Sequence, residues 1–217
     1  MIFIGDVHGN FARLASEISR FKICDEILIQ VGDFGIGFGD DLEKLTILNN
    51  YLKEFNNHLY VIRGNHDDPL YFKGNYNYSN LHLLADYSIL NFNGLNFLFV
   101  GGAISIDRIP NQKDGYYWKD EEFALQEVFQ HVDVLVTHTA PSFCYPHTIN
   151  NLVLQYSQND KNLLKDLEKE RALVTYLFNS LSVKYHFYGH FHSRYEETIG
   201  KTRHILLNIM EFKEFKL

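Results

Sequence analysis

Short polar motifs recur along this chain, each directly after an apolar run of strand character. They read GDVHG at residues 5–9, GD at 32–33, GNHD at 64–67, TH at 137–138 and GHFH at 189–192. In α/β proteins the ligand crevice lies just past the carboxyl ends of the strands. The positions of the motifs therefore predict that side chains far apart in the sequence meet at one site.

The side chains in these motifs are typical ligands of transition metals. Five of the 11 histidines fall in the motifs, together with the carboxylates of Asp6 and Asp33 and the amide of Asn65. Nitrogen and oxygen donors without thiolate suit manganese, iron, zinc or nickel, and this set is too rich in imidazole for magnesium or calcium. Seven side chains, one of them a bridging aspartate, would give each of two ions four protein contacts. We therefore expect two divalent metal ions, with manganese as the first choice.

In their order along the chain, the motifs resemble those of the calcineurin-like metallophosphoesterases, and the resemblance covers residues 5–192. It implies an α/β fold of four layers, an αββα sandwich of two mixed sheets flanked by helices. It also implies hydrolysis of phosphoesters, in which a hydroxide that bridges the two metals attacks phosphorus in line.

The resemblance further assigns a role to each motif residue. It places Asp6, His8 and His192 on the first metal, Asn65, His138 and His190 on the second, and Asp33 between them. The catalytic residues would be His66, as proton donor to the leaving oxygen, and its neighbour Asp67.

The stretch GDFGIGFGD at residues 32–40 allows two other interpretations, and its context excludes both. A kinase DFG triplet needs an upstream catalytic loop, and a P-loop needs a following Lys-Ser/Thr. Serine/threonine protein phosphatases continue this motif as GDxxDRG, whereas Ile36 and Gly37 stand here in place of the second Asp and the Arg. Replacement cations for substrate binding would be Arg63 and Arg108, with Arg194 as a weaker candidate.

Three functions remain open. The first, which the sequence favours, is a phosphomonoesterase (phosphatase) acting on phosphoproteins or small phosphorylated molecules, which needs an arginine in the metal pocket. The second is a phosphodiesterase acting on cyclic nucleotides, nucleotides or oligonucleotides, with stacking from Tyr116, Tyr117 or Trp118. The third, a non-catalytic scaffold of the same fold, is disfavoured because all seven ligands are present.

Alternating apolar runs and helical periods indicate the elements that must position the motifs. Strands are predicted over residues 2–4, 27–31, 59–62, 95–100, 132–136, 185–188 and 205–209. Helices are predicted after Asn10, after Asp40 or Asp41, from Asp120 to Phe129, and from Lys161 to about Leu181. The polar residues 104–118 are predicted to form a functional loop.

The composition agrees with an ordinary globular protein. The chain has 217 residues, of which 46% are hydrophobic and 22% charged, and a formal charge of −7, so we expect one domain over residues 1–217 and no general nucleic-acid binding. Cys24 and Cys144 suggest neither a disulfide framework nor a thiolate zinc site, which fits the cytoplasm. We see no signal peptide and no run of membrane-spanning length.

Overall fold

Two β-sheets form the centre of the molecule in the computed structural model, which describes residues 1–39, 41–76 and 78–216. The first sheet consists of β1 (Ile2–Ile4), β2 (Ile27–Gln30), β3 (His58–Val61), β4 (Leu81–Leu83) and β11 (Phe212–Glu214). The second consists of β5 (Ser88–Phe92), β6 (Leu95–Val100), β7 (Val134–Thr137), β8 (Tyr185–Tyr188), β9 (Tyr195–Ile199) and β10 (Thr202–Leu206). Their strand orders are β11-β1-β2-β3-β4 and β5-β6-β7-β8-β10-β9.

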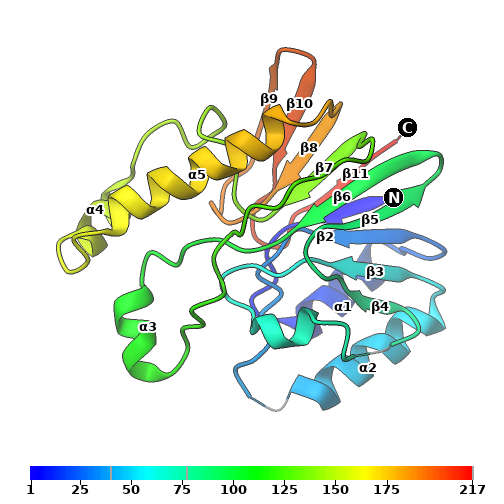
Figure 1. Ribbon diagram of the computed structural model, residues 1–217. Helices are drawn as coiled ribbons and strands as arrows, with labels where there is room; N and C mark the ends of the chain where they lie inside the picture. The colour runs from blue at the N-terminus through cyan, green and yellow to red at the C-terminus, as the bar shows by residue number, and fades with distance from the viewer. Residues whose placement is uncertain (40, 77, 217) are drawn as a thin grey trace.

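Most neighbouring strands are parallel, which brings their carboxyl ends to the same edge. In the first sheet only β11 runs antiparallel to its neighbour, and in the second sheet only β5 and β9 do. The pairing of β1 with β11 places the two ends of the chain side by side (Figure 1). Both sheets are therefore mixed, as predicted.

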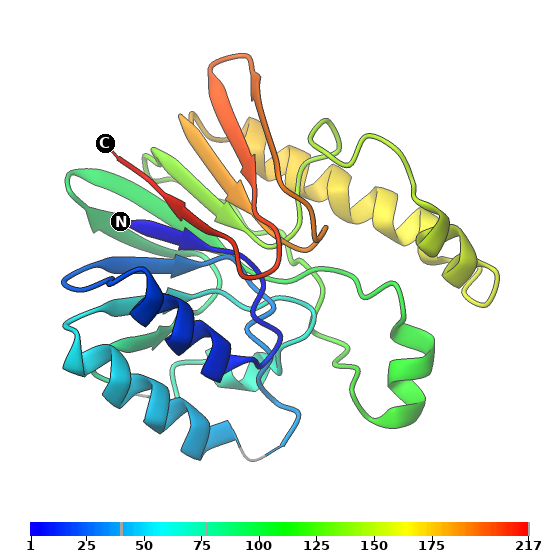
Figure 2. The ribbon, with the colours of Figure 1, turned by 180° about the vertical axis from the view of Figure 1, so that it is seen from behind.

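The helical elements lie outside the two sheets (Figures 1 and 2). They are α1 (Phe11–Arg20), α2 (Asp41–Glu54), the 3₁₀ turn η1 (Pro69–Phe72), α3 (Arg108–Asp114), α4 (Asn151–Ser157) and α5 (Leu163–Asn179). Side chains of α1 and α2 pack on the first sheet, and Val174 and Leu177 of α5 pack on the second. The predicted αββα architecture is confirmed.

Alternation along each strand separates the three apolar layers of the molecule. Phe3 and Ile29 point into the core between the sheets, where Phe3 stacks on Phe187 of β8 with ring centroids 3.5 Å apart. The next residue in β1, Ile4, and the preceding one in β2, Leu28, face α1 and α2 instead. Each interior strand is thus buried on both faces, and little motion is left to the residues at its carboxyl end.

The helix starts follow from capping groups. The side chain of Asn10 accepts a hydrogen bond from the backbone N–H of Arg13, so the predicted cap of α1 is confirmed. Of the two candidates for α2, Asp40 lies outside the described residues. Asp41 opens the helix, and its carboxylate accepts the N–H of Gly37 at 2.7 Å.

The helix predicted from Asp120 to Phe129 is wrong, because residues 121–129 form neither helix nor strand. Their backbone groups bond to neighbouring elements instead: the N–H of Phe123 donates to Glu170 of α5, and Tyr87 bonds the carbonyl of Ala124 and the N–H of Gln126. The predicted loop 104–118 also differs, since it contains the short helix α3.

Among the described residues, no helix combines the length and the apolar character needed to cross a bilayer.

Candidate metal centre

The predicted ligands lie together at the carboxyl ends of five strands. Asp6 and His8 follow β1, Asp33 follows β2, Asn65 follows β3, His138 follows β7, and His190 and His192 follow β8. Their nitrogen and oxygen atoms fall into two groups that share Asp33. The structure thus brings all seven side chains to one edge of the molecule.

The first group contains Asp6, His8, Asp33 and His192, whose ligand atoms all lie within 4.8 Å of one another. Nε2 of His192 is 3.3 Å from Oδ2 of Asp6 and 3.0 Å from Nε2 of His8. Nε2 of His8 lies 3.9 Å from Oδ2 of Asp33. Two imidazole nitrogens and two carboxylates therefore converge on one point.

The second group uses the other oxygen of Asp33. Oδ1 of Asp33 is 3.1 Å from Nε2 of His138, which is 3.2 Å from Oδ1 of Asn65. His190 completes the group, with its ring centroid 5.1 Å from that of His138. Because Oδ2 faces one group and Oδ1 the other, the carboxylate of Asp33 is placed as a bridge.

Both groups fit divalent metal ions by the chemistry of their donors. His138 donates its Nδ1 proton to the carbonyl of Val31 at 2.8 Å, which leaves Nε2 as the ligand atom, an arrangement common to metal-binding imidazoles. Burial lowers the pKa of His190 well below its usual value, so this ring is neutral and keeps a lone pair. The set of nitrogen and oxygen donors without sulfur suits manganese, iron, zinc or nickel.

The charges within the second group also favour a cation. Burial would raise the pKa of Asp33, but the imidazole of His138 holds it well below its usual value. Burial would likewise lower the pKa of His138, and the carboxylate of Asp33 outweighs this and raises it to about 9. A buried carboxylate is thus balanced by a proton on its neighbour, and a divalent ion can take over that positive charge.

The backbone at the ligands is held in an uncommon conformation. His8, Asp33, His190 and His192 have φ of 49°, 54°, 70° and 47°, in the left-handed region that side chains other than glycine seldom adopt. Such strain persists only where the surroundings enforce it, and it concentrates at functional sites.

Close packing of backbone supports the bridge. A Cβ at Gly64 would collide with both the carboxylate and the backbone nitrogen of Asp33, so only glycine allows this approach. The backbone N–H of His66 also donates to Oδ1 of Asp33 at 2.9 Å. The turn after β3 therefore fixes the position of the Asp33 carboxylate.

His66 lies next to both groups but belongs to neither. Its ring is in edge contact with that of His8, with the centroids 5.5 Å apart. Within residues 1–39, 41–76 and 78–216, no carboxylate bonds to this ring, and the position of the second phosphatase aspartate is occupied by Ile36, which is buried in the core. The ring is thus free to face a substrate.

Asp67, predicted as a catalytic residue, is completely buried and accepts backbone hydrogen bonds. Its carboxylate receives the N–H groups of Phe34, Gly35, Ile36 and Gly64 at 2.6 to 3.2 Å. This geometry does not support contact with a substrate. It makes Asp67 a positioning residue that joins the turns after β2 and β3.

Two residues that support Asn65 could not be identified from the sequence. The amide nitrogen of Asn65 donates to Oγ of Ser105 at 3.0 Å, which turns the amide oxygen toward His138. Glu121, which is buried, accepts the backbone N–H of Ser105 and bonds its hydroxyl. These residues lie 40 and 56 positions after Asn65 and belong to no motif, so only the fold reveals the connection.

The two predicted substrate-binding arginines are engaged with the protein. The guanidinium of Arg63 donates to Asp86 at 2.7 and 2.9 Å and to two backbone carbonyls, and its side chain is only 6% exposed. Arg108 binds Asp160 and Asp166, both at 2.6 Å. Arg194, the weaker candidate, pairs with Glu211 at 3.1 Å. The geometry therefore does not support a phosphate-binding role for Arg63 or Arg108.

In sequence, the chain matches a known protein family. The profile of the calcineurin-like phosphoesterases matches residues 1–194. No protein with a curated description matches in sequence.

Among solved structures, the protein TT1561 of Thermus thermophilus superposes with a TM-score of 0.55 at 11% identity, covering 96% of this chain and 89% of that one. A zinc complex of Vps29 from Entamoeba histolytica superposes with a TM-score of 0.36 at 10% identity, covering 96% of this chain and 74% of that one. An archaeal phosphodiesterase superposes with a TM-score of 0.40 at 12% identity, covering 96% of this chain and 84% of that one. At these identities the first similarity concerns the fold alone, and the other two scores are too low to carry an argument.

The profile spans 194 of the 217 residues and includes every predicted ligand. The chain accordingly belongs to the calcineurin-like phosphoesterase family and is a metal-dependent hydrolase of phosphoric esters.

Proposed function

We propose that this protein hydrolyses phosphodiesters at a dinuclear metal centre. The ligands are Asp6, His8, Asp33 and His192 for one ion and Asp33, Asn65, His138 and His190 for the other. The observation that supports this most strongly is the carboxylate of Asp33, whose two oxygens face two separate donor groups. We propose manganese as the resident ion, with iron, zinc and nickel as alternatives.

When bound, the two ions would supply an activated water and positive charge for the phosphoryl oxygens. The protein contributes the positions: strained turns aim the ligands, and Asp67 and Gly64 hold the turns together. His66, beside the first group and outside it, is placed to give a proton to the leaving oxygen.

The ion pairs of the three candidate arginines favour a diester substrate over a monoester. A dianionic monoester gains from an additional cation in the pocket, whereas a monoanionic diester needs it less. Arg63, Arg108 and Arg194 are all paired with carboxylates of the protein. The phosphomonoesterase that the sequence placed first stays a prediction, without the arginine that would support it.

Exposed aromatic rings in the segment that follows Asp33 and in the segment that follows α3 support a nucleotide-like diester. Phe38 contacts Tyr116 and Trp118, with ring centroids 5.4 and 5.1 Å apart. Phe38 and Tyr116 are 40% and 47% exposed, and Trp118 packs against Gly37 in the segment that follows Asp33. Aromatic rings of this kind can stack on bases.

The test is to load purified protein with manganese, nickel or zinc and to compare turnover of bis-p-nitrophenyl phosphate and p-nitrophenyl phosphate. We expect faster turnover of the diester, and a loss of about 10³-fold in Asp33→Asn, since the bridging charge is removed. Asp25→Asn, at an exposed carboxylate, is the matched control.

Faster turnover of the monoester would overturn the diester preference. No turnover of either ester, with Asp33→Asn identical to the wild type, would overturn the dinuclear centre. A panel of cyclic nucleotides, dinucleotides and single-stranded oligonucleotides then identifies the substrate class.

The location we propose is cytoplasmic, because among the described residues both Cys24 and Cys144 are free thiols.

A further inference from the structure

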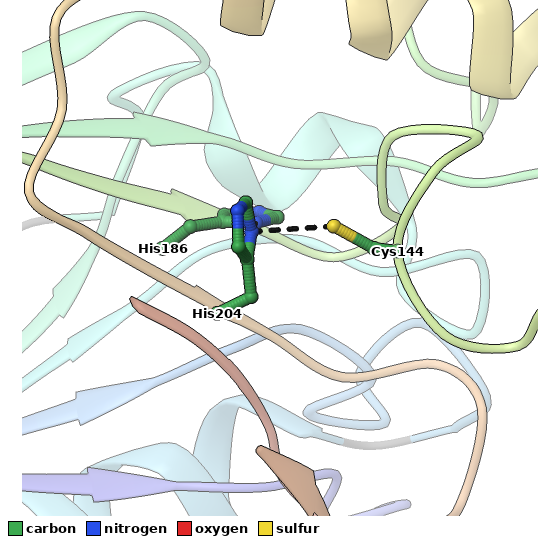
Figure 3. A group of neighbouring side chains, drawn as sticks. All are labelled: Cys144, His186 and His204. Carbon is green, nitrogen blue, oxygen red and sulfur yellow. Dashed lines mark hydrogen bonds between the residues drawn. The ribbon is translucent and has the colours of Figure 1, made fainter. Parts of the chain in front are cut away.

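A second cluster of metal-binding side chains lies on the outer face of the second sheet. It consists of Cys144, His186 and His204, and we refer to it as the Cys-His-His cluster (Figure 3). Nδ1 of His204 is 3.1 Å from Nδ1 of His186 and 3.2 Å from Sγ of Cys144. All three side chains are buried, and none of them belongs to the dinuclear centre.

The strand register explains why the two imidazoles meet. His204 of β10 lies opposite His186 of β8 and opposite Glu197 of β9, so all three point to one face of the sheet. Their sequence neighbours Phe187 and Ile205 point the other way, into the core between the sheets. The cluster therefore stands under α5, whose Phe178 contacts the ring of His204 with the centroids 5.2 Å apart.

Cys144 reaches the imidazoles from the segment that follows β7. Arg171 of α5 holds this segment by donating hydrogen bonds to the carbonyls of Ala140, Pro141, Cys144 and Pro146 at 2.5 to 3.3 Å. The position of the sulfur beside His204 is thus fixed by a half-buried guanidinium that binds four carbonyls of the segment.

The hydrogen bonds of His186 define its protonation. The hydroxyl of Thr137 donates its single proton to the carbonyl of Thr139, so it can only accept from Nε2 of His186, at 2.7 Å. Burial lowers the pKa of His186 well below its usual value, and the ring is neutral. Nδ1 therefore carries a lone pair that points into the cluster.

No protonation of His204 satisfies the cluster by hydrogen bonds alone. With the proton on Nε2, an atom that has no partner among the described residues, two nitrogen lone pairs face each other across 3.1 Å. With the proton on Nδ1, His186 is satisfied, but Nε2 is a buried acceptor without a donor and the thiol proton of Cys144 has no acceptor. Unpaired buried polar groups of this kind are costly.

We propose that Cys144, His186 and His204 bind a zinc ion that fastens the segment after β7 to β8 and β10. One thiolate and two imidazoles are donors that zinc prefers, and they would take three positions of its tetrahedral arrangement. Bond lengths to zinc place such donors about 3.3 to 3.6 Å apart, so the distances from Nδ1 of His204 to the other two donors need to change by only a few tenths of an ångström. His204 would bind through Nδ1 and keep its proton on Nε2.

Binding is coupled to loss of a proton. Burial raises the pKa of the Cys144 thiol to about 12, so the thiol stays protonated until a cation replaces the proton, which is released to solvent. A zinc ion with one thiolate retains a single positive charge, and the carboxylate of Glu197 on the same face of the sheet can balance it. Glu197 also holds the segment, by accepting the N–H of Tyr145 at 3.0 Å.

Cobalt substitution tests the proposal, because this cluster is the one candidate donor group among the described residues that contains sulfur. The full chain is expressed in cobalt-containing medium, so that the ion enters while the buried cluster forms. We expect a thiolate-to-cobalt charge-transfer band in the near ultraviolet, which the nitrogen and oxygen ligands of the dinuclear centre cannot produce. Zinc-grown protein should lose one equivalent of zinc in Cys144→Ser.

Matched variants complete the design. Cys24→Ser, at the exposed cysteine, should keep the band, and so should His8→Ala, which alters the dinuclear centre. Both Cys144→Ser and His204→Gln should lose it. A cobalt-grown wild type without the band overturns the proposal, and this result does not depend on any variant folding. Equal zinc content in the wild type and Cys144→Ser would overturn it too.

Discussion

His66 is the imidazole whose role depends on the leaving group. A nucleoside alkoxide leaves only with a proton, whereas p-nitrophenolate leaves without one. We expect His66→Gln to lower kcat about 10²- to 10⁴-fold on a dinucleotide and to change it little on bis-p-nitrophenyl phosphate. The measurement is steady-state turnover of both esters by protein with matched metal content.

His131→Gln, at an exposed imidazole, controls for a general effect of the substitution. If His66→Gln lowered kcat equally on both esters, His66 would bind the phosphoryl group and would not protonate the leaving oxygen.

Ser105 controls how Asn65 presents its oxygen. The hydroxyl of Ser105 accepts a hydrogen bond from the amide nitrogen of Asn65. Without this hydroxyl, the amide could turn so that its nitrogen and oxygen exchange places. We expect Ser105→Ala to weaken binding of one metal ion about 10- to 100-fold, measured by titration of metal into the apo protein. Ser19→Ala, far from the centre on α1, should bind both ions as the wild type does. Unchanged affinity in Ser105→Ala would remove Ser105 from the centre.

The sequence could predict which side chains converge at the candidate metal centre, and it could not predict what supports them. A ligand stands at a strand end within a short motif, so its type and spacing reveal it locally. The partners of Asn65 and Arg63, Ser105 and Asp86, are 40 and 23 residues away and are ordinary residues of their segments. For the same reason the sequence did not indicate Cys144 as a metal ligand, because His186 and His204 lie on strands more than 40 residues later.

At the level of elements, burial decides which strands the sequence reveals. All seven predicted strands overlap interior strands, β1, β2, β3, β6, β7, β8 and β10, although the one predicted over 205–209 is shifted, since β10 spans Thr202–Leu206. The four that were missed, β4, β5, β9 and β11, are the edges of the two sheets. An interior strand is apolar on both faces, whereas an edge strand such as β9, with the sequence YEETI, is largely exposed and carries no apolar pattern.

Helix α5 contains a buried carboxylate that links stability to pH. One oxygen of Glu170 accepts the N–H of Phe123, and the other has no partner within the described part of the chain. Burial raises its pKa from 4.5 to about 8, and Glu122 and His138 are the charged groups that face it. Between these two pH values the folded protein keeps a proton that the unfolded chain has lost. The free energy of unfolding should therefore fall as pH rises through this window.

Glu170→Gln should remove this dependence. At pH 8 we expect the free energy of unfolding of the variant to exceed that of the wild type by about 1 to 3 kcal/mol. Near pH 4.5 the difference should nearly vanish, because the folded carboxyl is then neutral and the unfolded one is only about half ionised. Urea denaturation of metal-saturated protein at both pH values measures the difference. Glu168→Gln, exposed on the same helix, should show none. A stability difference that is constant with pH would mean that Glu170 is ionised in the folded protein.

At the scale of the whole molecule, the two sheets are joined near the metal centre by Arg63. It follows β3 in the first sheet, and Asp86, its partner, lies between β4 of the first sheet and β5 of the second. The same guanidinium donates to the carbonyls of Glu121 and Glu122, in the segment that forms neither helix nor strand. Since the candidate ligands come from both sheets, the distances between them depend on this connection.

Arg63→Met separates the structural role of this arginine from binding of substrate. Methionine fills similar space without the charge, so we expect the free energy of unfolding to fall by about 3 kcal/mol, since Asp86 and two carbonyls lose their partner. Well below the melting temperature, kcat/KM on a diester should stay within about twofold of the wild type. Arg13→Met, at an exposed arginine, should change neither quantity. A large loss of kcat/KM with unchanged stability would mean instead that the guanidinium leaves Asp86 to bind the phosphoryl group, and the preference for diesters would lose its main support.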